Sequence, residues 1–379
     1  MGTAYRLFTK VDEGKRSVAL MEDSTLLEFY QEDDNVDGIV GTIYLGRVER
    51  VLPDVKAAFV KIGLKQNGFL PIKESESFHR SPEGNKPLMS GEQVLVQAKK
   101  APKGGKGAFL TRDIALPGQY VLVMPCNRFV GLSKRIEDNG EREYAKNLGR
   151  KIAADRFGVI VRHAALFVSE HEVQLEADAL FALWNDLSRK AEVMKAPAVM
   201  HTEAPIAEIL ARDYSARHKV EQSDDFELWH QFDIERQLKE AIGRRVELKG
   251  GGSLIIDERE ALQTIDVNSG SAVKAASDMS LALEENLRAV PEIARQIRLR
   301  NLSGIILVDF IDMETDAERE KVRLAMETAI ADDRVKNVIH GFTRLGLLEM
   351  TRKRTGDSLR DLLTTPCSKC CETGRLPNG

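Results

Sequence analysis

Acidic and amide side chains alternate with apolar ones in two short segments of the chain. LQTIDVNSG (262–270) contains Asp266 and Asn268, and GIILVDFIDM (304–313) contains Asp309. Burying an isolated carboxylate costs several kcal/mol unless it is paired, protonated or bound to a metal ion. Two carboxylates with a carboxamide beside them suit Mg²⁺, which binds one or two carboxylates and keeps waters and phosphate oxygens in its other positions. The alternative is that each aspartate ends a strand and caps a loop. The residues alone leave these two interpretations level.

Both segments predict β-strands that must position these side chains. Side chains alternate between the two faces of a strand, so Asp266 and Asn268 share one face. Ile265 and Val267 share the other face. In the second segment apolar residues stand on both faces, which predicts a strand covered on both sides. Strands and helices alternate from residue 250 onward, and that alternation is typical of a layered α/β domain.

The end of the chain contains half of a zinc site. Cys367 and Cys370 form a CxxC pair, and the sequence contains no second pair of this kind. Structural zinc needs four ligands, and a symmetric dimer meets this need if each chain gives two thiolates. Cys371 and His340 are alternative further ligands. The other interpretation is an inert or adventitious pair, but a polar tail without a following helix favours zinc over redox chemistry.

Residues 38 to 116 predict a small β-barrel of the OB type, because short apolar strands follow one another with Gly, Pro and Asn turns between them. Phe59 and Phe69 come from adjacent expected strands, and a lysine-rich stretch (97–112) with Lys106 follows. Phenylalanines most often belong to a core. The lysines nearby favour the second interpretation, in which the rings stack on nucleic-acid bases beside a track for phosphates.

Composition excludes several classes of protein. The net charge is −4, from 55 basic and 59 acidic residues, so charge alone does not indicate a nucleic-acid binder. No apolar run reaches membrane-spanning length, and the N-terminus lacks the apolar core of a signal peptide. Three of the four cysteines lie together. This arrangement argues against a disulfide framework, and we expect a cytoplasmic protein that does not contact the membrane.

Longer motifs resemble the ribonuclease E/G family of bacterial endoribonucleases. They are GGGSLIIDEREALQTIDVNSG, RQIRLRNLSGIILVDFIDM, GLLEMTRKR and the terminal CxxC. LPDVKAAFVKIG and NGFLPIKE resemble the S1 domain of that family. The resemblance covers nearly the whole chain, and the segments TRKR and DRVK are closest to the ribonuclease G branch.

The resemblance implies an activity and its cofactors. The expected activity is Mg²⁺-dependent hydrolysis of single-stranded RNA to 5′-phosphate and 3′-hydroxyl ends, with a preference for 5′-monophosphorylated RNA, in the processing and decay of rRNA and mRNA. Asp266 and Asp309 match the Mg²⁺ ligands, for which Mn²⁺ is an expected substitute, and Asn268 matches the residue that assists at the scissile phosphate. Cys367 and Cys370 match a zinc link between the subunits of a homodimer.

The resemblance also assigns RNA-binding residues. Phe59, Phe69 and Lys106 match the RNA-gripping positions of the S1 domain. The positions of the pocket that senses the 5′-phosphate are Gly118, Leu122, Arg162, His163 and Lys336. Two of these depart from the family pattern, because His163 replaces the usual threonine and Lys336 stands where some members have arginine. Taken alone, an arginine at the end of the strand VIVR would most often be a surface charge.

The implied fold is a multidomain α/β and α+β protein. It consists of an RNase H-like lobe (1–37 and 208–241), interrupted by an S1 barrel of the OB type (38–117) and a 5′-sensor region (118–207), then a DNase I-like α/β catalytic domain (242–364) and a zinc-link tail (365–379). The second part of the lobe is short by a strand and a helix, with Tyr214 to Phe226 bridging the gap, so the lobe is reduced or residues are missing. Ser368 replaces an expected proline, Cys371 is extra, and the family's small C-terminal domain is absent.

A rival function belongs to another class of protein. It is a non-catalytic S1-type RNA-binding protein held as a dimer by zinc. The presence of Asp266, Asn268 and Asp309 together argues against this alternative, because a protein that only binds RNA has no need of the three.

Overall fold

The computed structural model describes residues 4–33, 38–75, 88–102, 105–136, 138–215, 218–270 and 281–365. The chain divides into two compact units. Unit 1 draws on residues 1–31 and 220–379, and unit 2 on residues 32–219. Both units mix strands and helices, so the fold is mixed α/β as expected.

Unit 1 begins with a small sheet whose strands come from both segments of the unit. Its strands are β1 (Tyr5–Asp12), β2 (Lys15–Glu22), β3 (Thr25–Asp33) and β14 (Val220–Ser223), in the order β14-β1-β2-β3. β1 and β14 are parallel, with Tyr5 opposite Val220. The helices α4 (Phe226–Gln231) and α5 (Ile234–Ala241) follow. Trp229 and Ile234 from these helices share a hydrophobic core with Phe8 of β1.

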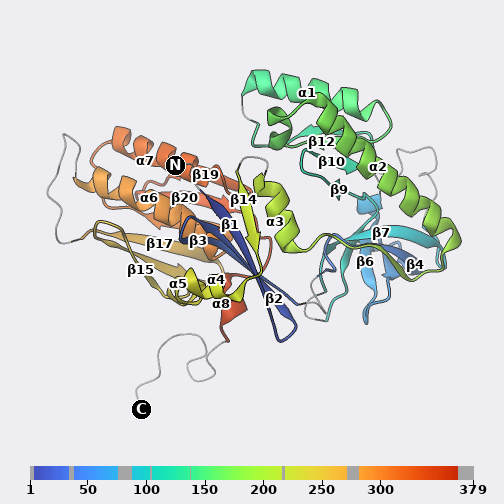
Figure 1. The fold of residues 1–379 in the computed structure, drawn as a ribbon, viewed down its shortest axis with the longest axis horizontal. Helices are drawn as coiled ribbons and strands as arrows, with labels where there is room; N and C mark the ends of the chain where they lie inside the picture. Colours follow the sequence, from blue (N-terminus) through green and yellow to red (C-terminus); the bar gives the residue numbers. More distant parts are fainter. Residues whose placement is uncertain are drawn as a thin grey trace, which may run out of the picture. The chain divides into compact units, whose positions relative to one another are not determined.

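A second sheet of unit 1 contains both segments that carry the acidic residues. Its described strands are β15 (Arg245–Glu247), β16 (Ser253–Glu258), β17 (Leu262–Asn268), β18 (Gly304–Asp309), β19 (Asn337–Phe342) and β20 (Leu347–Arg352), in the order β15-β16-β17-β18-β20-β19. The helices are α6 (Leu281–Leu299), α7 (Asp316–Ile330) and the short α8 (Leu359–Leu363). α6 and α7 lie side by side along the sheet (Figure 1), and their side chains join its hydrophobic core.

That core shows which face of the sheet is covered. Ile265, Ile306 and Val308 are fully buried in it. On the opposite face of β18, Ile305 is 50% exposed. The expectation that this strand is covered on both sides is therefore wrong. One face packs against helices, and the other face, which carries Asp309, is open.

Unit 2 begins with the barrel. Its strands are β4 (Ile43–Leu52), β5 (Ala57–Lys61), β6 (Gly68–Pro71), β7 (Gln93–Lys100) and β8 (Phe109–Thr111), with β13 (Ala198–His201) added outside β4 and the 3₁₀ turn η1 (Ile72–Ser75) after β6. β7 pairs back onto β4, so the described strands β4 to β8 form a closed ring. The interior is apolar, with Val60, Leu70 and Val96 among its buried residues. The prediction of a small barrel from residues 38 to 116 is confirmed.

The rest of unit 2 is a small sheet packed against helices. The strands are β9 (Leu116–Pro117), β10 (Val121–Met124), β11 (Val130–Leu132) and β12 (Gly158–Val161), in the order β11-β12-β10-β9, so β11 lies at an edge. The helical elements are α1 (Asn139–Ala153), the 3₁₀ turn η3 (His163–Phe167), α2 (Glu170–Val193) and α3 (Ile206–Ser215). α1 packs closely on the sheet at Gly149, where a Cβ atom would lie 2.9 Å from Val130.

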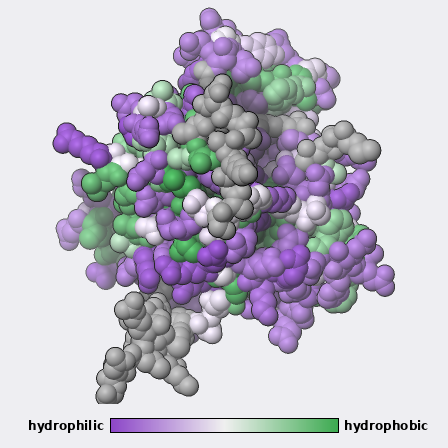
Figure 2. Space-filling model, turned by 90° about the vertical axis from the view of Figure 1, so that its left-hand side faces the viewer, coloured by the Kyte–Doolittle hydropathy of each residue, from purple (hydrophilic) through white to green (hydrophobic). Residues whose placement is uncertain are grey.

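The surface shown in Figure 2 is hydrophilic over most of its area, and its hydrophobic side chains gather in smaller patches. Among the helices of the described residues, none is both long enough and apolar enough to cross a membrane.

Candidate functional site

Asp266 and Asp309 are neighbours on adjacent strands. β17 and β18 are parallel, and these two residues are partners in their register. Adjacent strands lie about 4.8 Å apart, and partners in register point to the same face. Both residues are exposed, whereas Ile265 and Val308 beside them are fully buried. The two carboxylates therefore stand side by side on the open face of the sheet, at the end of both strands.

Asn268 completes this group. Its side-chain Nδ2 donates a hydrogen bond of 2.8 Å to Oδ2 of Asp266. The turn before β16 passes very close to Asn268, because a Cβ atom at Gly252 would lie 2.7 Å from the Asn268 carbonyl oxygen. Gly252 also has φ +83°, which favours glycine. The glycine run at residues 250–252, which opens the motif GGGSLIIDEREALQTIDVNSG, thus lets the chain pass close to the end of β17.

The electrostatics of the group favour a cation. Desolvation and the negative charges of Asp266 and Asp312 raise the pKa of Asp309. A cation held between the carboxylates would relieve this repulsion. Arg244 also interacts with the charge of Asp266, although its guanidinium is bonded to Asp257 at 2.8 and 2.7 Å. Sequence reasoning missed Arg244, because only the pairing of strands brings it near the aspartates.

The donor set fits magnesium. In the part of the chain that the structure describes, no group of three or more His, Cys, Asp or Glu side chains is arranged to hold a metal ion. Mg²⁺ is satisfied by one or two carboxylates, with waters and phosphate oxygens in its remaining positions. Asp266 and Asp309 offer those two carboxylates on an open surface.

A row of aromatic rings crosses the outside of the barrel. Phe59, Phe69 and Phe109 are partners on β5, β6 and β8. Their ring centroids are 6.0 Å apart for the first pair and 6.1 Å for the second. Ala58 and Val60 point inward and fill the barrel, so Phe59 points outward and is 36% exposed. The interpretation of these rings as barrel core is wrong. Sequence reasoning missed Phe109.

Lysines flank this row of rings. Lys106 is exposed just before β8. Lys100 places its Nζ atom 5.7 Å from the centre of the Phe109 ring, a cation–π distance. Lys99 is bonded to Glu74 at 2.6 Å. Lys103 lies outside the described residues. The outer face of the barrel therefore combines aromatic rings with at least two lysines that face solvent or a ring.

The structure brings four of the five expected sensor residues into one small sheet. Gly118 follows β9, and Leu122 of β10 pairs with Pro117 of β9. Arg162 follows β12, and its backbone N–H donates to the Tyr120 carbonyl at 2.8 Å. The ring of His163, at the start of η3, lies 5.0 Å from that of Phe167. The fifth residue, Lys336, is exposed immediately before β19 and belongs to unit 1.

Arg162 is not a lone surface charge. Its Nη1 donates to the carbonyl of Gly118 at 2.5 Å, and its Nη2 donates to Oδ1 of Asp213 at 3.0 Å. The Asp213 side chain is only 13% exposed. Arg212 lies 3.4 Å from the same oxygen and donates to the Pro117 carbonyl at 3.1 Å. Asp213 thus holds two arginines against neighbouring carbonyls. The sequence offered no signal for this contact across 51 residues.

A carboxylate fills the turn beside Arg162. Three successive backbone N–H groups, from Gln119, Tyr120 and Val121, donate to Glu176 at 2.5, 2.8 and 3.0 Å. A Cβ atom at Gly118 would lie 2.4 Å from the carboxylate carbon of Glu176, so a larger residue there would displace this carboxylate. These three N–H groups are satisfied within the protein.

The proposed zinc ligands Cys367, Cys370 and Cys371 lie outside the described residues. His340, the remote alternative ligand, is exposed on β19, with Nε2 3.2 Å from Oγ1 of Thr351. Cys126 is a buried free thiol.

Comparison with known proteins identifies the class. A sequence profile of the Ribonuclease E/G family matches residues 115–221 and 215–355. Ribonuclease G of Escherichia coli (strain K12) is 35% identical over 98% of this chain and 84% of its own length, as is Ribonuclease G of Salmonella typhimurium (strain SL1344). Ribonuclease E of Escherichia coli (strain K12) is 33% identical over 98% of this chain and 38% of its own length.

The chain belongs to the ribonuclease E/G family. It is therefore an endoribonuclease, and the expected likeness to the ribonuclease G branch is confirmed. The two matched segments overlap at residues 215–221, within the stretch from Tyr214 to Phe226 that we expect from the sequence to be shortened.

Proposed function

We propose that the protein is a Mg²⁺-dependent endoribonuclease that hydrolyses single-stranded RNA and leaves 5′-phosphate and 3′-hydroxyl ends. It prefers 5′-monophosphorylated RNA and acts in RNA processing and decay in the cytoplasm. The observation that carries this proposal is the pairing of Asp266 with Asp309 on one open face of the sheet, with Asn268 bonded to Asp266.

The two aspartates would hold the metal. Bound Mg²⁺ supplies activation of a water molecule and neutralises charge that develops on the phosphate. The water oxygen bonds to phosphorus while the bond to the 3′-oxygen breaks, and that oxygen takes up a proton. The upstream product then ends in a 3′-hydroxyl and the downstream product begins with a 5′-phosphate. One amide hydrogen of Asn268 is used by Asp266, and an amide carries two, so the second can donate to a phosphoryl oxygen.

The barrel holds the RNA strand that is cleaved. Bases stack on the outward rings of Phe59, Phe69 and Phe109, which every base can do through its π-face. Lys100 and Lys106 provide positive charge for the phosphates beside those rings. This arrangement would bind RNA with little preference for sequence.

Arg162 recognises the 5′ end. A guanidinium has five N–H donors, and two of them are engaged with Gly118 and Asp213. The remaining donors and the positive charge are available for a terminal phosphate. His163, the next residue in the chain, adds a ring N–H. Because Glu176 already accepts hydrogen bonds from the neighbouring backbone N–H groups, recognition of the terminal phosphate rests on side chains.

The family relationship supports names for the parts. We assign the S1 domain to the barrel, the 5′ sensor to the β9–β12 sheet, the RNase H-like lobe to the sheet of β1–β3 and β14, and the DNase I-like domain to the sheet of β15–β20. Cys367 and Cys370 of two chains share one zinc ion in a homodimer.

Cleavage of a short single-stranded RNA tests the function. The RNA carries a fluorophore at its 3′ end and is incubated with Mg²⁺, with EDTA, and with EDTA followed by excess Mn²⁺. We expect cleavage in the first and third conditions, and mass spectrometry should find 5′-phosphate on the downstream product. RNA that is bound but uncut in Mg²⁺ would instead support the rival RNA-binding protein.

A further inference from the structure

A groove lies between helix α1 and the edge strand β11 of unit 2, and its volume is about 550 Å³. It is lined by Val130, Gly131, Leu132, Arg142, Glu143, Lys146, Asn147 and Arg150. The expected RNA-binding and catalytic residues contribute nothing to this lining. The groove therefore needs its own explanation.

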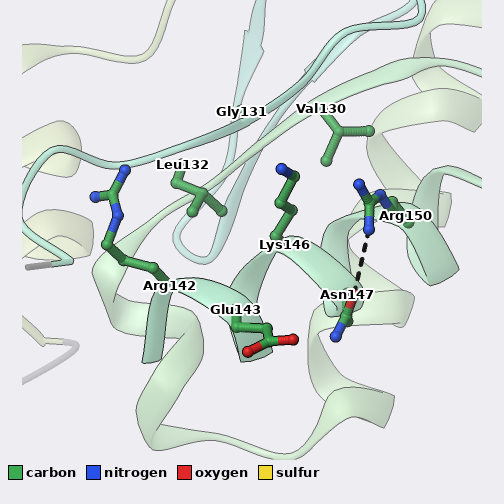
Figure 3. Close-up of a pocket in the computed structure, with 8 residues that line it drawn as sticks. All are labelled: Val130, Gly131, Leu132, Arg142, Glu143, Lys146, Asn147 and Arg150. Carbon is green, nitrogen blue, oxygen red and sulfur yellow. Dashed lines mark hydrogen bonds between the residues drawn. The ribbon is translucent and has the colours of Figure 1, made fainter. Parts of the chain in front are cut away.

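Three cations line the groove at regular intervals. Arg142, Lys146 and Arg150 follow one another every four residues on α1, and all three are exposed. Figure 3 shows that their charged ends reach toward β11, whereas the carboxylate of Glu143 points away from it. Val130 projects into the same space.

The hydrogen bonds of these cations do not neutralise their positive charge. Arg142 donates from Nη1 to the Ile136 carbonyl at 2.6 Å, and Arg150 donates from Nη1 to Oδ1 of Asn147 at 3.4 Å. Both acceptors are neutral. Lys151 on the same helix differs, because it forms an ion pair with Glu170. The groove thus concentrates positive charge that its own polar contacts do not neutralise.

We propose that this groove binds the phosphate backbone of the single-stranded RNA substrate as a second track, separate from the barrel. Four residues of helix rise about 6 Å, so the cations repeat along the groove much as phosphates repeat along an extended strand. Val130 and Leu132 offer apolar surface for sugars between the charges. An acidic peptide fits less well, because β11 spans only Val130–Leu132 and gives a very short edge for main-chain pairing.

This inference rests on the proposed function, since it assumes that RNA is the substrate. The test measures RNA affinity without cleavage. Full-length protein carrying Asp309→Asn is titrated in EDTA with a fluorescent RNA long enough to contact both the barrel and the groove. Log Kd is plotted against log salt concentration, with and without the triple substitution Arg142→Gln, Lys146→Gln and Arg150→Gln.

Each phosphate neutralised on a single strand contributes about 0.7 to the salt slope. We therefore expect the triple variant to lose about 2 from the slope and to bind at least tenfold more weakly at low salt. Lys151→Gln is the matched control on the same helix and should leave the slope unchanged. The triple variant Arg142→Lys, Lys146→Arg and Arg150→Lys keeps the charges and should keep the slope, which separates loss of charge from loss of folding.

An unchanged slope in the glutamine variant, while the parent protein binds RNA, would overturn the groove as an RNA track. Polyglutamate whose own binding needs the three cations, while the salt slope for RNA does not, would also overturn it, because the groove would then be a peptide site. If the parent protein does not bind RNA at all, the proposed function fails and this inference fails with it, whereas an unchanged slope in a protein that binds RNA overturns this inference alone.

Discussion

Arg162 and Asp213 form an ion pair of 3.0 Å that joins the end of β12 to helix α3. The carboxylate is largely buried, and the guanidinium is also tied to the Gly118 carbonyl. An anchored pair of this kind fixes the orientation of an arginine before a ligand arrives. Asp213 is therefore a positioning residue for the proposed 5′ sensor.

The first prediction concerns that pair. Asp213→Asn should reduce the preference for 5′-monophosphorylated over 5′-hydroxyl RNA about tenfold, since a bond to a charged group contributes roughly 1.5–3 kcal/mol. Arg162→Gln should reduce the preference at least as much. The measurement is kcat/KM for matched RNAs that differ only at the 5′ group. Asp186→Asn, which breaks the exposed pair of Asp186 with Lys190 in α2, is the control. A preference that survives in Asp213→Asn but not in Arg162→Gln would make Asp213 purely structural.

The second prediction concerns the catalytic group. Asp266→Asn and Asp309→Asn should each reduce cleavage to background, because either change removes a proposed metal ligand from the pair. RNA affinity should be nearly unchanged, since the aromatic rings proposed to bind the RNA strand belong to the other unit. Cleavage rate and fluorescence anisotropy are compared with those of Glu247→Gln, an exposed acid of the same sheet that pairs with Arg245. Turnover close to wild type in both aspartate variants would contradict the assignment of these residues as metal ligands.

The third prediction concerns the aromatic row. Phe59→Ala, Phe69→Ala or Phe109→Ala should each weaken binding of single-stranded RNA by roughly 5- to 150-fold, since stacking contributes about 1–3 kcal/mol per base. The thermal midpoint should change little for Phe59, which lies outside the barrel core. Phe226→Ala removes a ring in unit 1 that is 54% exposed and should leave affinity intact. Equal effects of all four substitutions would argue against a specific stacking surface.

The fourth prediction concerns assembly. Cys367→Ser should release zinc and convert a dimer to a monomer, because each chain would supply half of the proposed tetrathiolate. Light scattering and metal analysis on the wild type and the variant measure both changes, and Cys126→Ser is the control with the same chemical change. A dimer that keeps full zinc in Cys367→Ser would point to Cys371 or His340 as ligands instead.

The fifth prediction concerns Cys126. Burial raises the pKa of this thiol to about 12, so only about one part in ten thousand is thiolate at pH 8. Iodoacetamide at pH 8 should leave the Cys126 peptide unmodified in native protein and label it in denaturant, as mass spectrometry can show. An unfolded thiol ionises near pH 8.5, so this residue should lower stability only as pH rises above that value. Rapid labelling of native protein would contradict the packing around β10.

Local patterns in the sequence predicted local features of the structure. The alternation around Asp266 and Asn268 assigned these residues to one face of a strand, and the structure confirms that assignment. The same reasoning could not tell whether that face is covered, because covering depends on elements far away in the chain. It therefore wrongly predicted a strand covered on both sides at Asp309.

Contacts between residues that lie far apart in the chain could not be predicted from the sequence. Nothing near Arg162 indicates that Asp213 holds it, and nothing near Arg244 indicates that Asp266 is close. Phe109 was missed because its relation to Phe69 depends on the parallel pairing of β6 with β8, two strands that are separated in the chain by η1 and β7.

The chain leaves unit 1 after β3 and returns only at β14, where Val220 lies beside Tyr5. This path sets an order of events during synthesis. Unit 2 lies wholly within residues 32–219, so all of it is synthesised before β14. The first three strands emerge before it, but β1 has no partner on its outer edge until β14 is made. The sheet whose first three strands precede unit 2 is thus completed only after unit 2 has been synthesised, and during that interval β1 presents an open strand edge on which a chaperone could act.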